Sequence, residues 1–512
     1  MNMAESYGNQ DIATEAGDKP LAIVIGSGLG GMAAALRLLA KGYQVRILEK
    51  LDAAGGRAYV YEQDGFVFDA GPTIVTAPFM FEDLWSLFGR RFADDVDLRL
   101  MTPFYRVRFD DGTVFDYSND IENVKQQIRA FNPDDVDGYE RFLSASEQMY
   151  RIGFERMGMI AFRRITDLLR HLPAIIRLRG DRSVFKMVSR FIKDPYIRIA
   201  LSFHPLLIGG NPYSATSIYT LISFLEREWG VYSAMGGTGQ IVAAMIRLIE
   251  QHGGRISYES EVSEIVVEQG KATGVIMKSG EHIASDLVVS NADAAWTYRR
   301  LIAPEHRRRW TNSKISKARY STGLFVWYFG TRGTYPDVPH HSILLGPRYR
   351  GLLDDIFKHH RLAEDFSLYL HRPTATDPSM APPDCDTFYV LAPVPNLTAD
   401  VDWIEEAEPY RKKIEQYLER TVLPGLSDRI VCSMVSTPLD FKERLNSEKG
   451  AGFSFEPILT QSAWFRPHNA SEDIRNLYLV GAGTHPGAGM PGVLSSAAVL
   501  DTLVPNAVEW VR

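Results

Sequence analysis

The chain has 512 residues, of which 45% are hydrophobic and 23% charged, a balance typical of a folded globular protein with more than one domain. Its 56 basic and 63 acidic residues give a formal net charge of -7, which argues against nucleic acid as the main partner, because phosphate binding needs a basic surface. The two cysteines, Cys385 and Cys432, lie far apart and in no metal-ligand spacing, so neither a disulfide framework nor a metal site is expected.

The first 19 residues are predicted to form a disordered acidic tail. They contain Glu5, Asp11, Glu15 and Asp18 but only one basic residue, Lys19, and they lack the apolar core of a signal peptide. The expected location is therefore the cytoplasm, with at most peripheral contact with a membrane.

A nucleotide-binding unit is predicted to begin at residue 21. Leu21–Ile25 is a short apolar run typical of a buried parallel strand, and it leads directly into the glycine-rich turn 26–31. A helical stretch follows over Met32–Ala40, and Gln44–Leu48 is predicted to be the second strand. Strand, glycine-rich turn, helix and strand in this order predict a dinucleotide-binding βαβ unit.

Three glycines of the turn have a structural role in such a unit. Gly26 permits the tight bend, Gly28 lets the backbone approach a pyrophosphate, and Gly31 allows the helix to pack closely on the strand. The N–H groups at the start of the helix are available to phosphate oxygens. Glu49, at the end of the second strand, is placed to accept a hydrogen bond from a ribose hydroxyl.

Gly55, Gly56 and Arg57 follow this unit, and the segment Asp69–Thr73 comes shortly after them. Two glycines beside an arginine let the chain pass close to a pyrophosphate while the guanidinium neutralises its charge. This arrangement resembles the amine oxidase-like flavoprotein superfamily, in which it contacts FAD.

The middle of the chain is predicted to change from strands to helices and back. Phe104–Phe109 and Thr113–Tyr117 are expected to form a hairpin, residues 131–234 look mainly helical, and Arg255–Ile283 alternates like antiparallel hairpins with turns at Gln269-Gly270 and Ser279-Gly280. Asp286–Ser290 then has the pattern of a buried strand.

Two stretches of the helical region bear on membrane contact. Residues 199–225 carry no formal charge, but Pro205, Gly209, Gly210 and Pro212 interrupt them, which favours a buried wall over a membrane span. Residues 151–198 hold twelve Arg or Lys against four Asp or Glu, interleaved with apolar residues. This basic stretch is either a solvated face of amphipathic helices or a surface that binds anionic lipid.

The end of the chain has the same order of a strand, a glycine-rich stretch and a helix as its beginning. Leu477–Val480 is a strand pattern, residues 481–492 are rich in glycine, and a helix is predicted over Val493–Leu503, starting near Gly492. Small residues let the backbone lie against a flat ligand, and a helix N-terminus would stabilise the negative charge of a reduced flavin. Both ends of the chain are thus expected to build one FAD site.

With these motifs the sequence resembles the bacterial phytoene desaturases, the carotenoid desaturase branch of that superfamily. The resemblance covers nearly the whole chain after residue 20, and it rests on segments Phe68–Thr73, Thr102–Tyr105, Ser202–Leu207, Gly209–Pro212, Leu225–Val231, Ser290–Asp293, Gly346–Tyr349, Gln461–Asn469 and Gly481–Gly492.

The resemblance implies an α/β fold with three parts. A Rossmann-like FAD-binding domain would be built from the discontinuous segments 20–79, 235–296 and 465–512, and an α+β substrate domain from 80–130 and 297–464. Residues 131–234 would form a mainly helical domain that faces the membrane. The residues expected to bind FAD are Gly26, Ser27, Gly28, Gly30, Gly31, Glu49, Lys50, Gly55, Gly56, Arg57, Gly71, Pro72, Thr73, Val262, Asn291, Gly483, Pro491, Gly492 and Val493.

The implied reaction is FAD-dependent desaturation of phytoene to neurosporene or lycopene, by hydride transfer to flavin N5. The implied partners are a membrane-dissolved C40 carotenoid precursor, the anionic inner face of the cell membrane, and oxygen or a quinone as electron acceptor. A related carotenoid isomerase or ketolase, and a non-enzymatic isoprenoid-binding module of the same fold, are the alternatives.

No catalytic residue is assigned from the sequence. Residues 142–147 lack the Asp and Arg that have been sought in the family as acid and base at this place. His204, Glu226 and Glu228 are single candidates for proton transfer or substrate contact, each of a kind that is more often structural. The pairs His340-His341 and His359-His360 are expected to be loop residues, and no metal ligands are predicted.

Overall fold

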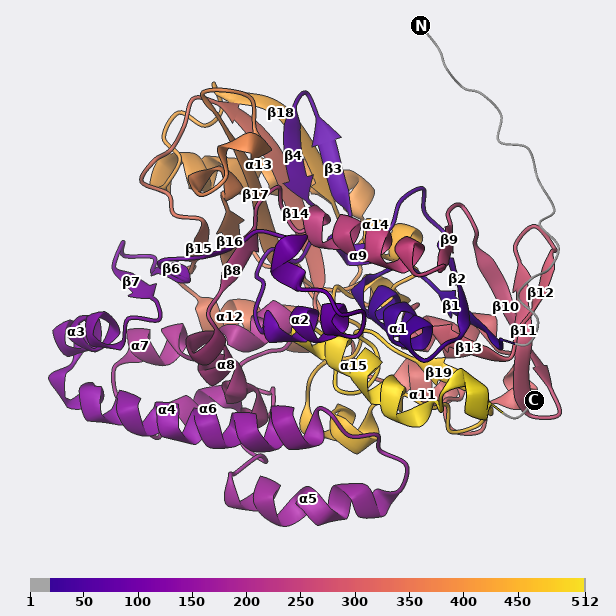
Figure 1. Ribbon diagram of the computed structural model, residues 1–512. Helices are drawn as coiled ribbons and strands as arrows, with labels where there is room; N and C mark the ends of the chain where they lie inside the picture. Colours follow the sequence, from indigo (N-terminus) through magenta and orange to yellow (C-terminus); the bar gives the residue numbers. More distant parts are fainter. Residues whose placement is uncertain (1–18, 511–512) are drawn as a thin grey trace, which may run out of the picture.

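The computed structural model describes residues 19–510, so the predicted acidic tail lies outside the described residues except for Lys19. Figure 1 shows two sheets side by side, with a layer of helices below the larger one. The chain passes between these parts several times, and its first and last helices, α1 and α15, lie next to each other.

A five-stranded parallel sheet carries the nucleotide-binding turn. Its strands run in the order β19, β13, β1, β2, β9. They span Leu477–Leu479 (β19), Leu287–Ser290 (β13), Leu21–Ile25 (β1), Gln44–Leu48 (β2) and Arg255–Ser257 (β9). Strand β1 is apolar throughout and β13 is apolar except for Ser290, and both are buried on both faces except at Leu21, as is typical of parallel strands between helices. Helices α1 (Leu29–Ala40), α9 (Gly239–Gln251) and α15 (Met490–Leu503) pack in one core with this sheet.

Three predictions for this sheet need correction at their edges. Helix α1 begins at Leu29 and not at Met32, because the extended backbone of Gly28 already completes the turn. Helix α15 begins at Met490, directly after Gly489 with φ of 94°, and Pro491 lies in its first turn, where a missing N–H costs nothing. Arg255–Ser257 is not part of a hairpin but pairs in parallel with β2.

The predicted hairpins after β9 are confirmed. Strands β10 (Val262–Glu268), β11 (Lys271–Met277) and β12 (His282–Ala284) form a three-stranded antiparallel sheet. Its turns fall at Gln269-Gly270 and at Gly280, and all three residues have positive φ.

A seven-stranded sheet forms the second wall of the molecule, in the order β18, β14, β17, β16, β15, β6, β7. Its strands span Tyr105–Arg108 (β6), Val114–Tyr117 (β7), Gly323–Arg332 (β14), His341–Leu344 (β15), Leu368–His371 (β16), Cys385–Val394 (β17) and Ile430–Ser436 (β18). The predicted hairpin at 104–117 is confirmed as β6 and β7, and it joins the sheet through parallel pairing of β6 with β15. Helix α13 (Trp403–Thr421) covers one face, where Trp403 and Tyr410 pack on Phe325.

Residues 131–234 are mainly helical, as predicted, and helix α3, which was not predicted, precedes them. The helices are α3 (Ile121–Phe131), α4 (Val136–Tyr150), α5 (Ile165–Arg177), α6 (Val184–Val188), α7 (Pro195–Ala200) and α8 (Leu221–Trp229). Helix α5 stands apart at the lower edge of the molecule in Figure 1. Across residues 19–510, none of the helices combines the length and the apolar character needed to cross a bilayer.

Short elements complete the fold. They are β3 (Val60–Gln63) paired with β4 (Phe66–Asp69), β5 (Leu98–Leu100) paired with β8 (Tyr232–Ala234), and the helices α2 (Phe79–Ser86), α10 (Ala294–Trp296), α11 (Asn312–Lys317), α12 (Tyr349–Asp354) and α14 (Pro438–Leu445).

Candidate functional site

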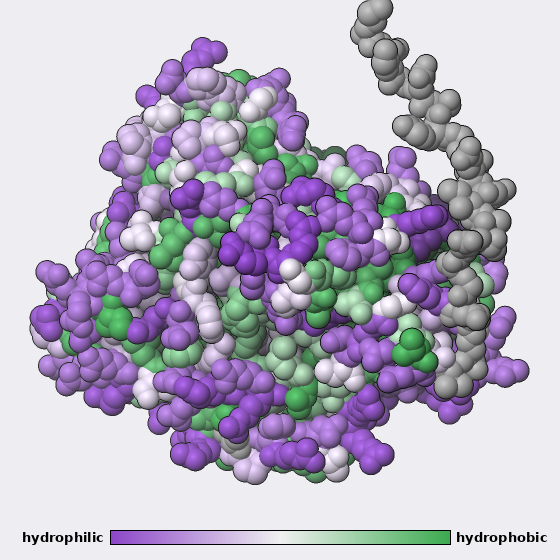
Figure 2. All heavy atoms as spheres, viewed as in Figure 1, coloured by the Kyte–Doolittle hydropathy of each residue, from purple (hydrophilic) through white to green (hydrophobic). Residues whose placement is uncertain are grey.

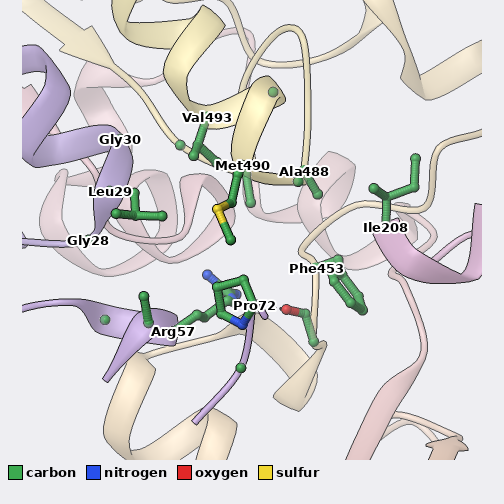
Figure 3. A pocket seen from close by; sticks show the side chains of 18 of the residues that line it. Gly28, Leu29, Gly30, Arg57, Pro72, Ile208, Phe453, Ala488, Met490 and Val493 are labelled. Carbon is green, nitrogen blue, oxygen red and sulfur yellow. Dashed lines mark hydrogen bonds between the residues drawn. The ribbon is translucent and has the colours of Figure 1, made fainter. Parts of the chain in front are cut away.

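A cavity of about 500 Å³ runs between the two sheets and the helical layer. In the close view of Figure 3, Arg57 and Pro72 lie on one side of it and Met490 and Val493 on the other. The glycine-rich turn at Gly28 lies toward one end, and Ile208 and Phe453 lie toward the other. One continuous space therefore connects the nucleotide-binding turn with an apolar region.

The turn after β1 is built so that the backbone is exposed to this cavity. Gly26 has φ of 89°, a conformation that side chains other than glycine rarely adopt. A Cβ atom on Gly31 would lie 2.2 Å from the carbonyl oxygen of Gly26, so only glycine lets the helix pack this closely on the turn. These two glycines fix the path of the chain, and Gly28 and Gly30 line the cavity.

Asn291 is the point where the two ends of the chain meet. A Cβ atom on Gly28 would lie 2.9 Å from its side-chain nitrogen, and Cβ atoms on Gly30 or Gly481 would lie 2.8 and 2.7 Å from its side-chain oxygen. Three glycines from two distant segments therefore surround the amide of Asn291. Each of them must lack a side chain for this amide to fit.

The first turn of α1 is open to an anion. Its N-cap residue is Gly28, which provides no side-chain cap, and its first turn holds no acidic residue. The unpaired N–H groups at a helix start and the positive end of its dipole favour phosphate groups. Glu49 follows β2, and its carboxylate accepts hydrogen bonds from the backbone N–H and the hydroxyl of Ser27, at 2.8 and 2.6 Å.

Arg57 brings a buried positive charge to the same cavity. Its Nε donates to the carbonyl oxygen of Gly452 at 2.7 Å, and its Nη2 donates to the hydroxyl of Ser447 at 2.9 Å. Burial lowers the pKa of this guanidinium, and the charge of Asp293 opposes the shift. Within the described part of the chain Arg57 has no salt bridge, so its charge is left to an anion in the cavity.

Three tyrosines hold the loop that follows β4. The hydroxyls of Tyr328 and Tyr389 donate to the carbonyl oxygens of Ala70 and Gly71, at 2.6 and 2.9 Å. The hydroxyl of Tyr369 lies 2.8 Å from that of Thr73. The seven-stranded sheet thereby fixes the segment 70–73 against the cavity.

The site as a whole fits a dinucleotide with a flat ring system. One end offers an uncapped helix start, a carboxylate and a buried arginine, which suit a ribose and a pyrophosphate. At the other end α15 presents a second uncapped helix start, and its residues Pro491, Gly492 and Val493 line the cavity. The donor set and the close approach at Asn291 therefore match FAD.

Most residues expected to bind FAD line this cavity: Gly26, Gly28, Gly30, Glu49, Lys50, Gly55, Gly56, Arg57, Gly71, Pro72, Thr73, Val262, Asn291, Pro491, Gly492 and Val493. Ser27, Gly31 and Gly483 do not. Ser27 is bonded to Glu49, Gly31 packs on Gly26, and a Cβ atom on Gly483 would lie 2.9 Å from Ala294. These three residues do not line the cavity but hold in place the segments that do.

The apolar end of the cavity comes partly from the predicted wall and partly from residues that no motif indicated. It is lined by side chains of the helical layer, of the seven-stranded sheet, of α14 and of the loop after it: Phe203, Leu206, Leu207, Ile208, Ile222, Leu225, Leu324, Val326, Ile343, Leu391, Phe441 and Phe453. Residues 199–225 are thus the buried wall that the sequence predicted. The strand residues gave no local signal, because an apolar side chain in a strand packs on a core far more often than on a ligand.

The candidates for proton transfer separate in the structure. His204 and Glu226 are each 1% exposed, and their side chains lie 3.0 Å apart. Glu228 lies on the exposed side of α8. Glu226 lines the cavity, whereas Glu228 does not.

The expectation of loop residues is confirmed for His340, which lies in a bend just before β15, and is wrong for His341. His341 is the first residue of β15, and with His340 and His371 it forms a buried cluster whose ring nitrogens lie within 4.8 Å of one another. Burial lowers the pKa of His340 to about 3 and the pKa values of the other two well below their usual range, so all three are neutral. Their hydrogen bonds join the strands: His340 contacts His371 at 3.1 Å, and His341 contacts the hydroxyl of Tyr369 at 2.7 Å. His359 and His360 are exposed.

Comparison with known proteins places these features in a context. The family model described as "Flavin containing amine oxidoreductase" matches residues 29–498. The neurosporene-forming phytoene desaturase of Cereibacter sphaeroides is 52% identical, over 96% of each chain. The lycopene-forming phytoene desaturase of a Paracoccus species is 48% identical, over 93% of this chain and 95% of that protein.

Solved structures resemble the chain in fold. Putrescine oxidase bound to putrescine superposes with a TM-score of 0.64 at 13% identity, over 94% of this chain and 98% of that one. An oxidoreductase from Methanosarcina mazei gives a TM-score of 0.61 at 18% identity, over 94% and 99%. At these identities the likeness concerns the fold alone.

Proposed function

Because this chain belongs to the flavin-containing amine oxidoreductase family, we propose that it is an FAD-dependent desaturase that converts phytoene to neurosporene or lycopene in carotenoid biosynthesis. The observation that carries the proposal is the single cavity that joins a dinucleotide site to a long apolar wall. Phytoene desaturases at 48–52% identity match nearly the whole chain, which supports the same substrate class.

The residues that would hold FAD follow from the local chemistry. The N–H groups at the start of α1 and the guanidinium of Arg57 would bind the pyrophosphate, and Glu49 would accept a hydrogen bond from the ribose. The flavin ring would lie along the segments 71–73 and 491–493. When bound, the flavin supplies the two-electron acceptor that desaturation needs.

The chain's own contribution is to position the hydrocarbon and to exclude water. The wall formed by residues such as Leu206, Ile222, Leu324 and Phe453 offers no hydrogen bond to a polar substrate but wide contact to a polyene. Tyr328 and Tyr389 keep their hydroxyls bonded to the backbone of the loop 70–71, so that loop stays in place while the substrate moves.

Phytoene must reach this cavity from a membrane. At about 0.8 kcal/mol per methylene-sized unit, moving a forty-carbon hydrocarbon into water would cost roughly 30 kcal/mol. We infer that α5 and the basic stretch 151–198 bind the inner face of the cell membrane. Support comes from Phe154 and Met157, which line the cavity just before α5 begins, so that the docking helix adjoins the path of the substrate.

The electron acceptor is proposed to be oxygen or a membrane quinone. Docking on a bilayer brings the flavin site close to the phase in which quinones dissolve. Purified enzyme loaded with FAD, mixed with liposomes that contain phytoene, is expected to form neurosporene or lycopene, detected by chromatography. Either air or added quinone should sustain turnover.

Controls make this experiment decisive. Liposomes without enzyme and enzyme stripped of FAD should give no product. If the loaded enzyme leaves phytoene unchanged but modifies a carotenoid that is already coloured, the proposal fails and a ketolase or isomerase takes its place.

A further inference from the structure

Glu226 interrupts the apolar wall of the cavity, and it belongs to a buried polar cluster with Tyr105 and His204. The hydroxyl of Tyr105, on β6, donates to Oε1 of Glu226 at 2.7 Å. Oε2 of Glu226, on α8, lies 3.0 Å from Nε2 of His204. Tyr105 is 0% exposed, and the other two are 1% exposed. The three residues come from separate elements and converge at one place.

The carboxylate of Glu226 keeps one oxygen free. Although Oε2 is close to His204, neither this oxygen nor the histidine nitrogen has an aligned hydrogen-bond partner. Burial raises the pKa of Tyr105 well above its usual range, so this phenol stays protonated and donates. Its hydrogen bond occupies Oε1 of Glu226, so Oε2 is the carboxylate oxygen without an aligned donor.

The other carboxylates that line the cavity are committed elsewhere. Glu49 is bonded to Ser27 and to the N–H of Leu51, Asp440 caps α14 through Thr437, and Glu261 pairs with Lys278. Asp293 caps α10 through Oδ1, and although its Oδ2 also has no hydrogen-bond partner, this carboxylate lies within the field of Arg57. Among the lining residues that the structure describes, Glu226 is the acid whose neighbours in the cavity wall, Phe203, Ile222 and Leu225, are apolar.

We propose that Glu226 is the base that takes the proton lost by the substrate in each desaturation step. This inference rests on the proposed function. Desaturation removes hydrogen from two adjacent carbons. One hydrogen leaves with its bonding electron pair, which the oxidant of the reaction receives, and the other leaves as a proton. The electron pair of the second C–H bond becomes the new C=C bond, and the proton bonds to Oε2 of Glu226.

His204 and Tyr105 are positioning residues for this base. Tyr105 fixes one oxygen of the Glu226 carboxylate, and the other lies beside His204. His204 stacks on Phe203, with ring centroids 4.4 Å apart, and its imidazole is held within reach of the carboxylic acid that forms. Its Nε2 lies 3.0 Å from Oε2 and limits the movement of the carboxylate, which releases the proton before the next step.

The test replaces the carboxylate without changing its shape. Glu226→Gln keeps an oxygen for Tyr105 but cannot act as a base. Because general base catalysis contributes about 100- to 10,000-fold, the rate of phytoene consumption should fall at least about 100-fold. FAD content and equilibrium binding of lycopene, followed by its absorbance in the complex, should stay as in the wild type.

Two further variants separate a base from a structural role. Glu228→Gln changes an exposed glutamate on the same helix and should keep the wild-type rate. Glu226→Ala leaves room for a small acid, and added formate should restore part of its activity.

The outcomes distinguish this inference from the function on which it rests. If the wild type does not desaturate phytoene, the proposed function fails. If the wild type is active and Glu226→Gln is equally fast, Glu226 is not the base. The inference is also overturned if Glu226→Gln no longer binds lycopene, or if formate does not restore Glu226→Ala, because both results indicate a structural role.

Discussion

At the scale of single residues, the site depends on atoms that are absent. Gly28, Gly30 and Gly481 leave the space that Asn291 occupies, and this amide ties the first turn of the chain to the last. Arg57 supplies the opposite feature, a buried charge that has no salt bridge among residues 19–510. An anionic cofactor requires both features: space next to the backbone, which the glycines leave, and a positive charge outside any salt bridge, which Arg57 supplies.

Gly28→Val should abolish FAD binding. Gly28 has φ of -66°, so the backbone tolerates valine, and the substitution acts only through the volume of the added side chain. A Cβ atom at this position would lie 2.9 Å from Asn291 and would occupy the place where a pyrophosphate approaches the helix. Flavin absorbance per mole of purified protein should fall to the level of the apoprotein.

Gly351→Val is a matched control for this variant. Gly351 lies in α12, away from the cavity, and a Cβ atom there would approach only the side chain of Arg348, no closer than 3.4 Å. This control should keep its flavin. Normal FAD occupancy in Gly28→Val would contradict the placement of the site.

Residues could be predicted where a motif is local. The bend at Gly26 and the close packing at Gly31 follow from spacing alone, because strand, turn and helix lie within twenty residues. The cluster of Tyr105, His204 and Glu226 could not be predicted as a unit, since its members are up to 121 residues apart and meet only when β6 and α8 pack together. The histidine cluster could not be predicted for the same reason: His371 ends β16, whereas His341 begins β15 and His340 precedes it.

At the scale of elements, α5 departs from the usual pattern of an amphipathic helix. Its inner side, with Leu168 and Ile175, packs on a small cluster around Met157 and Phe162. Its outer side exposes Ile165, Leu169, Leu172 and Ile176, at 45, 52, 38 and 62%. Exposed apolar side chains at this spacing form a stripe, and a stripe next to arginines is typical of a helix that lies on a membrane surface. In Figure 2, hydrophobic and hydrophilic atoms mix along the lower edge, where Figure 1 places α5.

Reversing the charge of Arg163, Arg164 and Arg170 to glutamate should weaken binding to anionic liposomes. Each basic residue near an anionic surface contributes about 1 kcal/mol, so the loss of three should lower the affinity on the order of 100-fold. Sedimentation with liposomes measures the bound fraction, and its dependence on salt should also become weaker.

Lys412, Lys413 and Arg420 offer a control of equal charge. They are exposed on α13, which covers the seven-stranded sheet far from α5 in Figure 1. Reversing them to glutamate should leave sedimentation nearly unchanged. Equal binding by both triple variants would mean that the basic stretch is only a solvated face.

Most elements near the nucleotide site could be predicted from their patterns, and their ends could not. Helices α1 and α15 each begin earlier than expected, because glycine and proline in their first turns look like loop residues in sequence. Strand β9 has three residues, too few for a pattern, and only pairing with β2 identifies it. The order of the seven-stranded sheet depends on contacts between strands more than two hundred residues apart, such as β6 with β15.

At the scale of the whole molecule, the fold encloses one space with two different ends. The parallel sheet and its glycine-rich turns form the polar end, and the seven-stranded sheet and the helical layer form the apolar end. The segment that precedes α5 lines this space, which supports the proposal that α5 docks on a membrane near the entrance for the substrate. The central claim is therefore that a hydrocarbon from a bilayer meets FAD inside one cavity.

Anaerobic mixing of the FAD-loaded enzyme with phytoene in liposomes tests this claim most directly. Without oxygen or quinone, the absorbance of oxidised flavin should fall as phytoene is desaturated, by one equivalent of flavin for each new double bond. Liposomes that lack phytoene should cause no change. A flavin that stays oxidised in the presence of phytoene, in an enzyme with full FAD content and bound liposomes, would contradict the account.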